Sequence, residues 1–300
     1  MSVAFRNRTV TMVDVTSNSP DRTEASVSIT PPEGKQKPFV IKRLPGFTTI
    51  AIVCFFMLYA PIIALVAYSF NAGPNLAIWE GFSWRWYISA WGNEQVQDAT
   101  VRSVIVAVFA SVSATILATM AALGTTRVKP YRGIMAVFAM INQPLMVPEI
   151  VTGVALLTLF AMIKTATGYT GLGYLILAHT AFCIPFAYLP IRARLEGMDL
   201  TLETAAADLY ATPWMTFKRV TLPLLWPGIL AGMMLAFVIS LDDVVITEFV
   251  KSAGQDTLPT YMLGQLRRVV TPEINAISTV LLAVSVAIVT VFFFLNRSKK

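Results

Sequence analysis

The stretch TLETAAADLYATPWMTFKRVTLPLLWPGILAGMMLAFVISLDDVVI, residues 201–246, joins a polar segment directly to a long apolar run. The run continues from Leu224 to Ile246, and its only charged residues are Asp242 and Asp243 near the far end. About 20 consecutive apolar residues are what an α-helix needs to cross the hydrocarbon core of a bilayer. The stretch therefore predicts a membrane-spanning helix with a polar, water-facing segment before it.

The composition of the whole chain extends this prediction. Of the 300 residues, 56% are hydrophobic and 13% are charged, whereas soluble domains carry about 25% charged residues. Only helices and closed barrels satisfy their backbone hydrogen bonds in lipid, and a barrel would show short alternating segments instead of long runs. We predict an all-α integral membrane protein. The net charge of +6 does not indicate nucleic-acid binding, because the basic residues mostly flank apolar segments.

Six apolar runs are each long enough to cross the membrane. They are Thr48–Phe70, Val101–Gly124, Ile134–Ile163, Leu172–Ile191, Leu224–Ile246 and Asn275–Leu295. The third is longer than one span needs and contains Pro144 and Pro148, so we expect it to be kinked or split. The chain then divides into a six-span transmembrane domain, 46–300, and a preceding segment, 1–45. That segment is rich in Ser, Thr, Pro and charge, which predicts a disordered tail.

Basic residues are concentrated in alternate loops, which orients the spans by the positive-inside rule. They follow the second, fourth and sixth spans: Arg127, Lys129, Arg132, Arg192, Arg194, Lys218, Arg219, Arg297, Lys299 and Lys300. We therefore expect both termini and the loop 192–223 to be cytoplasmic, and the loops 71–100 and 247–274 to lie outside. The first apolar run begins near residue 47, which favours an uncleaved signal anchor over a cleaved signal peptide.

Small residues recur along two of the spans. The second span has alanines every four residues, at Ala110, Ala114, Ala118 and Ala122, and the fifth has Gly228 and Gly232 in a GxxxG arrangement. In lipid, small residues allow helix backbones to approach closely. These two spans are predicted to form the packed centre.

The external loop 71–100 is rich in aromatic residues: Trp79, Trp84, Trp86, Tyr87 and Trp91. Such side chains favour the membrane–water interface, where an apolar ring and a polar edge are both satisfied. The sequence leaves two interpretations open, a surface that binds an external partner and simple anchoring at the interface.

The polar segment before the fifth span has a helical pattern. Leu202, Ala205, Ala206 and Leu209 share one face. Thr201 is expected to cap this helix, with Glu203 in its first turn. Pro213 is predicted to start a second short helix, Trp214–Val220, that ends at Leu222–Pro223. The apolar edge of this pair requires a partner, which is either the lipid headgroup region or a cytoplasmic protein.

At residues 205–229, AAADLYATPWMTFKRVTLPLLWPGI, the chain resembles the cytoplasmic loop motif of ABC-importer permease subunits. In that family the loop forms a coupling helix that docks on a separate ATPase subunit. The residues that match it are Ala205, Ala206, Asp208, Leu209, Ala211, Leu222 and Pro223. Two positions depart: the family Glu falls on Thr204, although Glu203 precedes it, and the family Gly falls on Tyr210. A left-handed conformation at Tyr210 would cost about 1–2 kcal/mol.

Other segments resemble the permeases of the spermidine/putrescine importer group. They are YAPIIALVAYSFN (59–71), GFSWRWY (81–87), PLMVPEIVTGVALL (144–157), SLDDVVITEF (240–249), TLPTY (257–261) and TPEINAISTV (271–280). The resemblance implies a type I ABC importer permease fold in the bacterial inner membrane, forming half of a pathway for polyamines. It also implies four further subunits or proteins as partners: a second permease, two ATPase subunits and an external (periplasmic) substrate-binding protein.

Carboxylates within spans agree with a cationic substrate. Asp242 and Asp243 lie far along the fifth span, and Glu149 lies similarly far along the third. Intramembrane carboxylates are costly unless they face a cavity or a partner, so we predict that these three line the substrate pathway. The alternative is that one aspartate caps a helix end or pairs with a basic residue such as Arg267.

Enzyme chemistry is not indicated. His179 is the only histidine, and we interpret it as a packed polar residue; Cys54 and Cys183 have no metal-ligand spacing, so no metal site is predicted. No GxxxxGK[ST] phosphate loop occurs. We therefore expect no cofactor on this chain, with ATP and Mg²⁺ used by the partner ATPase. Competing hypotheses are a permease for another small solute, an ion-coupled secondary transporter, and a membrane-embedded enzyme.

Overall fold

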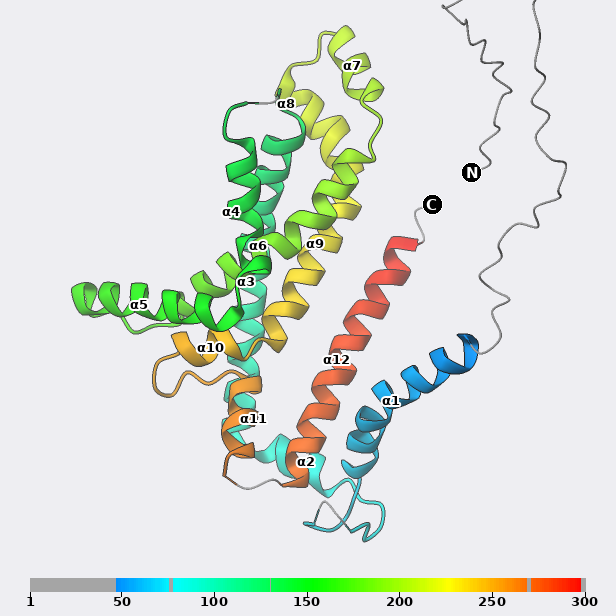
Figure 1. The fold of residues 1–300 in the computed structure, drawn as a ribbon, viewed down its shortest axis with the longest axis vertical. Helices are drawn as coiled ribbons and strands as arrows, with labels where there is room; N and C mark the ends of the chain where they lie inside the picture. The colour runs from blue at the N-terminus through cyan, green and yellow to red at the C-terminus, as the bar shows by residue number, and fades with distance from the viewer. Residues whose placement is uncertain (1–46, 76–77, 130, 269–270, 298–300) are drawn as a thin grey trace, which may run out of the picture. The chain divides into compact units, whose positions relative to one another are not determined.

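The structure is a computed structural model that describes residues 47–75, 78–129, 131–268 and 271–297 (Figure 1). The predicted tail, 1–45, lies outside the described residues. The chain divides into two compact units, Met1–Val53 and Cys54–Lys300. The first unit contributes only the beginning of one helix to the described part, and the account below concerns the second.

The described residues form helices, apart from loops and one isolated bridge between Asn71 and Phe82. The helices are α1 (Phe47–Tyr68), α2 (Arg85–Gly92), α3 (Glu94–Thr126), α4 (Ile134–Met146), α5 (Glu149–Thr167), α6 (Gly173–Glu196), α7 (Thr201–Asp208), α8 (Pro213–Thr216), a π-helix (Phe217–Thr221), α9 (Leu222–Asp242), α10 (Val245–Val250), α11 (Leu258–Leu266) and α12 (Pro272–Arg297).

Six segments of the described chain are long and apolar enough to cross a membrane. They are Thr48–Tyr68, Glu94–Thr126, Glu149–Thr167, Gly173–Glu196, Pro213–Asp242 and Pro272–Val291. The predicted all-α, six-span class is therefore confirmed. The cytoplasmic placement of the two termini stays a prediction.

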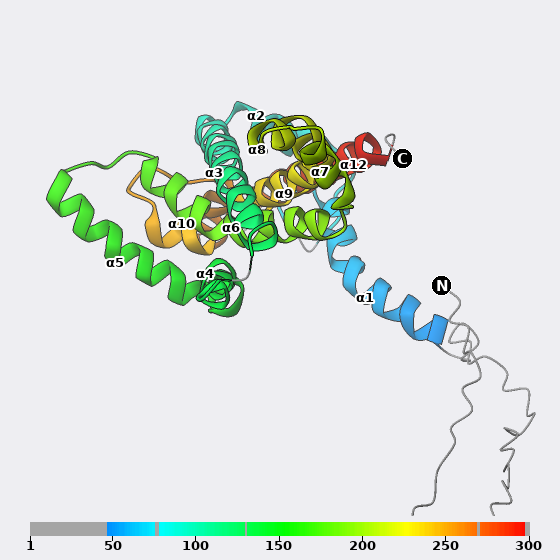
Figure 2. The same ribbon diagram turned by 90° about the horizontal axis from the view of Figure 1, so that it is seen from above.

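The packed centre consists of α3, α6 and α9, which lie against one another (Figures 1 and 2). Ala110, Ala114, Ala118 and Ala122 of α3 are fully buried. Gly232 of α9 lies so close to α6 that a Cβ atom there would be 2.6 Å from the carbonyl oxygen of Ala187. The small residues thus allow close backbone approach, as predicted for the second and fifth spans. The sequence did not indicate α6 as the third member.

The predicted third span is split at Pro148, whereas Pro144 lies within a helix. Helix α4 ends at Met146, Val147 and Pro148 have extended backbone, and α5 starts at Glu149. Pro148 cannot continue the helix of α4 because it lacks an N–H group and disfavours helical backbone in the residue before it. From above, α4 is seen almost end-on whereas α5 is seen side-on, so the two halves run in very different directions (Figure 2).

The fifth span differs from its prediction at both ends. At its C-terminal end, α9 stops at Asp242 and α10 begins at Val245 after a short non-helical link. At its N-terminal end, Leu222–Pro223 does not end the preceding helix. The π-helix passes directly into α9, and the Leu222 N–H donates to the carbonyl of Phe217, five residues back. This wider turn absorbs the Pro223 ring, so the predicted stop was wrong.

The segment that follows α1 is organised around the buried side chain of Asn71. Its Nδ2 donates to the carbonyls of Asn75 and Ile78, and its Oδ1 accepts from the Glu80 N–H at 2.8 Å. Beside it, aromatic rings pack on one another at centroid distances of 4.9 to 5.8 Å: Phe70, Phe82, Trp84 and Tyr87. Phe82 and Trp84 stay largely exposed. Both interpretations of this surface, partner binding and interface anchoring, remain open.

Candidate coupling loop and carboxylate cluster

The predicted coupling loop lies at the end of the α3–α6–α9 bundle that is opposite α2 and α11 (Figure 1). Helix α7 begins at Thr201, but the Thr201 side chain does not cap it. Instead the Asp199 carboxylate accepts the Thr201 N–H at 2.9 Å, and this hydrogen bond lowers the pKa of Asp199. The predicted cap at Thr201 was therefore wrong, and an aspartate just before the helix binds its first N–H instead.

The apolar side chains of this loop mostly face away from the rest of the chain. Leu209 is 81% exposed, Tyr210 is 97% exposed and Trp214 is 70% exposed. Among the predicted coupling residues, Thr204, Ala205, Asp208 and Pro223 are also exposed, whereas Glu203, Ala206, Ala211 and Leu222 are partly buried. None of the eight residues of α7 is buried. The loop thus presents an apolar surface that its own chain does not cover.

Tyr210 adopts the left-handed conformation, with φ of +59°, and is the only residue other than glycine with positive φ among those described. The Tyr210 N–H donates to the Ala207 carbonyl at 2.9 Å, and the Ala211 N–H donates to the Ala206 carbonyl at 3.1 Å. This pair of bonds is a Schellman motif, in which Tyr210 occupies the position that usually carries glycine. The left-handed conformation whose cost was considered from the sequence is thus the one that Tyr210 adopts.

Replacing Tyr210 with glycine is expected to stabilise the chain. A left-handed backbone costs a residue with a Cβ about 1–2 kcal/mol, and glycine offsets part of that gain by its freedom in the unfolded state. We expect a net gain of about 1 kcal/mol, measured as a higher melting temperature of the purified protein. The exposed ring loses no internal packing.

Tyr210→Ala is the matched control, because it removes the same ring and keeps the strained backbone. A melting temperature no higher in Tyr210→Gly than in Tyr210→Ala would contradict the strain. If both variants lose coupling to ATP hydrolysis equally, the ring itself contacts the ATPase.

The second short helix, α8, starts as predicted at Pro213. The Thr212 hydroxyl accepts the Met215 N–H at 3.3 Å and caps the helix. Pro213 is tolerated in the first turn because the N–H that it lacks would have no partner there. The helix then continues through the π-helix into α9, so the loop is joined rigidly to a core span.

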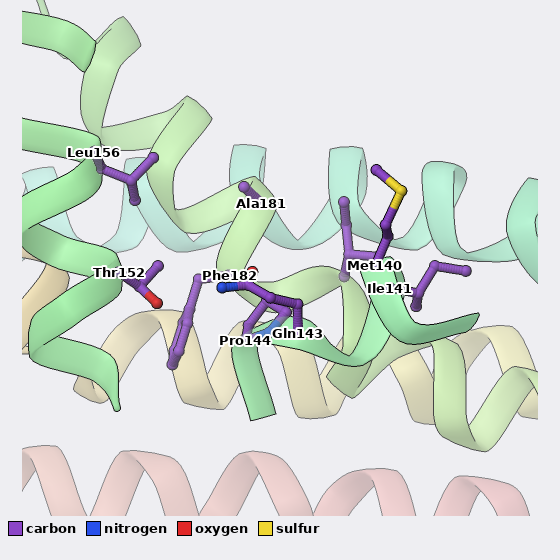
Figure 3. Close-up of a pocket in the computed structure, with 9 residues that line it drawn as sticks. Met140, Ile141, Gln143, Pro144, Thr152, Leu156, Ala181 and Phe182 are labelled. Carbon is purple, nitrogen blue, oxygen red and sulfur yellow. The ribbon is translucent and has the colours of Figure 1, made fainter. Parts of the chain in front are cut away.

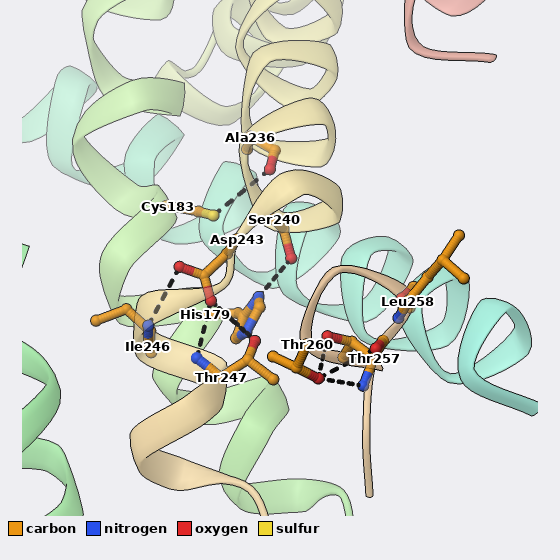
Figure 4. Close-up of polar contacts among 11 residues, drawn as sticks. His179, Cys183, Ala236, Ser240, Asp243, Ile246, Thr247, Thr257, Leu258 and Thr260 are labelled. Carbon is orange, nitrogen blue, oxygen red and sulfur yellow. Dashed lines mark hydrogen bonds and ion pairs between the residues drawn. The ribbon is translucent and has the colours of Figure 1, made fainter. Parts of the chain in front are cut away.

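At the C-terminal end of α9, Asp243 is buried and stabilises the break between α9 and α10 (Figure 4). Its Oδ1 accepts the Ile246 N–H at 3.3 Å, and its Oδ2 accepts the N–H and the hydroxyl of Thr247, both at 2.8 Å. These backbone groups belong to the first turn of α10, which has no earlier carbonyls to bind them. Asp243 therefore caps α10, which was the stated alternative to pathway lining.

His179 of α6 completes this network. Its Nε2 lies 2.8 Å from the Thr247 hydroxyl and 3.5 Å from Asp243 Oδ2, and its Nδ1 lies 2.8 Å from the Ser240 hydroxyl. Because Thr247 donates its hydroxyl proton to Asp243, its oxygen accepts from His179, which assigns the ring proton to Nε2. His179 is thus a satisfied, packed polar residue. The described residues include no group of three His, Cys, Asp or Glu side chains suited to a metal ion.

The other two carboxylates are more accessible. Asp242, the last residue of α9, is exposed, and Glu149 at the start of α5 is half-buried. Glu149 lies near enough to Asp243 for the two carboxyl groups to interact electrostatically. Arg267 lies 4.0 Å from Glu248, so its ion-pair partner is not one of the predicted aspartates. Lining of the substrate pathway by Asp242, Asp243 and Glu149 stays a prediction.

A cavity of about 340 Å³ lies next to the break between α4 and α5 (Figure 3). Its lining combines apolar side chains with the polar groups of Gln143 and Thr152. The Thr152 hydroxyl, one turn along α5 from Glu149, is buried and has no hydrogen-bond partner among the described residues. The cavity therefore places polar groups near the carboxylates, at the point where the third span is interrupted.

Two residues of this cluster, Ser240 and Thr247, were missed by sequence reasoning. A usable signal existed for one of them. Asp243 precedes Thr247 by four residues at the start of a short helix, and an aspartate in this place is a typical N-terminal cap. The contact of both residues with His179 had no sequence signal, because it joins separate helices.

Comparison with known proteins places the chain among transport proteins. The model of the family described as "Binding-protein-dependent transport system inner membrane component" matches residues 114–298. The putrescine transport system permease protein PotI of Escherichia coli (strain K12) is 38% identical over 264 residues, covering 87% of this chain and 94% of PotI. The spermidine/putrescine transport system permease protein PotC of Haemophilus influenzae is 37% identical and covers 82% of this chain and 94% of its own length.

Solved structures are similar at the level of the fold. A chain of a bacterial ABC transporter involved in the import of the acidic polysaccharide alginate has a TM-score of 0.65 at 17% identity, covering 84% of this chain and 94% of that one. A chain of the MetNI methionine ABC transporter in inward-facing conformations has a TM-score of 0.56 at 15% identity, covering 69% and 98%. The arrangement of helices described above is thus that of chains found in ABC transporters.

Proposed function

Since this chain belongs to the family of binding-protein-dependent transport system inner membrane components, we propose that it forms half of the pathway of an ATP-driven polyamine importer. It is a multi-pass protein of the inner membrane and a transport component, not an enzyme. The observation that carries the polyamine assignment is the 38% identity with a putrescine permease over 87% of the chain.

A cationic substrate also suits the chemistry of the outer end of α9. The exposed carboxylate of Asp242 and the half-buried carboxylate of Glu149 offer negative charge and hydrogen-bond acceptors to an alkylammonium group. Putrescine and spermidine both satisfy this requirement. Asp243 is committed to the cap of α10, so it contributes to the pathway through the electrostatic field of its charge near Glu149.

Energy is proposed to come from two separate ATPase subunits that use ATP and Mg²⁺. The α7–α8 loop supports this proposal, because it presents an uncovered apolar surface with Leu209, Tyr210 and Trp214 and is continuous with the core helix α9. An ATPase subunit could dock on this apolar surface, and the continuous helix could transmit its movement to α9. The loop side of the membrane is then the cytoplasmic side.

Two further partners complete the proposed importer. A single set of six spans makes half a pathway, so a second permease subunit is required. An external binding protein would deliver substrate to the loops around α2 and α11; one of the fold neighbours was solved in complex with a periplasmic protein, which supports this arrangement.

The proposal is tested by uptake in a strain that lacks this chain. Uptake of radiolabelled putrescine should fall, and the full-length chain should restore it. Depletion of ATP should abolish the restored uptake, whereas collapse of the ion gradient with ATP maintained should not. An ATPase should also remain bound when the chain is purified in mild detergent. Uptake that survives ATP depletion but not gradient collapse would identify an ion-coupled transporter instead.

A further inference from the structure

We propose that Glu203 is the positioning residue that fixes the coupling helix α7 to the ends of the three core helices. This inference rests on the proposed function, because it assigns the route by which movement of the coupling loop reaches the pathway. The observation behind it is that one carboxylate oxygen of Glu203 accepts hydrogen bonds from two side chains, those of Arg127 and Thr221.

The Oε1 atom of Glu203 accepts from Nε of Arg127 at 3.2 Å and from the hydroxyl of Thr221 at 3.1 Å. Arg127 directly follows α3, and its Nη2 also donates to the carbonyl of Leu195 in the last turn of α6, at 3.1 Å. Thr221 directly precedes α9 and is buried. One carboxylate of α7 is therefore connected to the ends of α3, α6 and α9, which are the helices of the packed centre.

No buried apolar contact holds α7 in the same way. None of its eight residues is buried, so the hydrophobic effect contributes less to its position than to that of the core helices. The side chains of Arg127 and Glu203 are only 17% and 22% exposed. A charged hydrogen bond that is mostly shielded from water is screened less than a surface ion pair and fixes a more definite geometry.

The connection also bypasses the two non-helical links of the loop. Residues 197–200 link α6 to α7, and residues 209–212 link α7 to α8. Movement passed only through those links would be partly lost in their backbone rotations. Movement passed through Glu203 reaches all three core helices at once.

The chain offers a matched control in Glu196. Its Oε1 accepts from Nε of Arg192 at 2.7 Å, so it forms the same kind of ion pair near the same end of the bundle. Both partners belong to α6, however, and the pair is more exposed, at 32% and 54%. Removing the Glu196 carboxylate changes only the surface of α6 and breaks no ion pair between helices.

The test compares Glu203→Ala, Glu203→Gln and Glu196→Ala by two measurements. The first is hydrogen exchange of the α7 amides in the purified full-length chain, which needs no substrate or ATPase. The second is putrescine uptake per ATP hydrolysed by the assembled transporter in proteoliposomes. Hydrogen exchange measures how firmly α7 is held in position. Uptake per ATP measures whether that position matters for coupling ATP hydrolysis to transport.

Glu203→Ala should speed exchange in α7 about tenfold, equivalent to about 1.4 kcal/mol, and should lower uptake per ATP by a similar factor. Glu203→Gln keeps an acceptor oxygen for both donors and should retain most of both properties. Glu196→Ala should match the wild type in both measurements.

Unchanged α7 exchange in Glu203→Ala would overturn the positioning role. Faster exchange with unchanged uptake per ATP would overturn its use in coupling. A wild-type transporter without ATP-driven uptake would contradict the proposed function, and the exchange measurement would still decide whether Glu203 positions α7.

Discussion

Replacing Gly232 with alanine is expected to disrupt the packed centre and to leave little folded protein. The added Cβ would lie 2.6 Å from the carbonyl oxygen of Ala187 and 3.2 Å from its Cα. Both are backbone atoms of α6, so α6 and α9 must move apart to relieve the contact. Overpacking of a well-packed interior typically costs about 1–3 kcal/mol, and we expect the upper end here because no side chain can rotate away.

The melting temperature and the yield of purified protein measure this effect. Gly124→Ala is the control, because a Cβ there meets no atom within 4 Å, and alanine is favoured over glycine in a helix by about 1 kcal/mol. It should be as stable as the wild type or more stable. Gly228→Ala should also destabilise the centre, since its closest neighbour at 2.7 Å is Cβ of Arg194, an atom whose position is fixed by the α6 backbone. Equal stability of Gly232→Ala and Gly124→Ala would contradict the close approach of α6 and α9.

The number and type of the spans could be predicted because length and apolarity alone decide them. The central role of α6 could not, since its buried side chains include His179, Tyr188 and Pro185 and not a repeat of small residues. Helix α6 lies in the centre because the small residues of α3 and α9 allow its backbone to come close. Those small residues are in α3 and α9, so the sequence of α6 itself does not reveal its position.

Breaks within spans were predictable only where a local residue causes them. Pro144 and Pro148 predicted the division between α4 and α5 because proline acts on its own backbone. The break after Asp242 is different, since it is stabilised by a network that includes His179 of another helix. At Leu222–Pro223 a helix end was predicted but none occurs, because the π-helix accommodates a proline that would otherwise end a helix.

In the coupling loop, too, features caused by a single residue could be predicted, whereas contacts between separate elements could not. The sequence identified its residues and the unusual Tyr210, whose strain is a property of one backbone position. It did not identify the partners of Glu203, because Arg127, Leu195 and Thr221 come from three different elements. The exposed apolar face could be predicted as a stripe, but which side of α7 faces the bundle depended on those contacts.

Asp242→Asn is expected to lower transport without lowering stability, whereas Asp243→Asn is expected to lower stability. Asp242 is exposed at the end of α9, so its amide variant should fold normally. It should lower the uptake of putrescine about tenfold, since loss of one favourable charge contact of about 1.4 kcal/mol corresponds to that factor. Asp243→Asn should instead lower the melting temperature.

The reason lies in the hydrogen bonds that Asp243 accepts. Its two oxygens receive three donors, from Ile246 and Thr247, and an amide offers one oxygen while presenting two hydrogens of its own. At least one buried donor then loses its acceptor, which costs about 1–3 kcal/mol. Ser240→Ala is a milder control, because it removes one hydrogen bond to His179 and leaves the cap of α10 intact.

Both variants are compared by melting temperature and by the concentration dependence of putrescine uptake. Unchanged uptake kinetics in Asp242→Asn would exclude this carboxylate from the substrate pathway. A loss of uptake in Asp243→Asn at an unchanged melting temperature would show that the substrate, and not only α10, uses the Asp243 carboxylate. The two neighbouring aspartates would then share one role, although their burial and their hydrogen bonds in the structure indicate two.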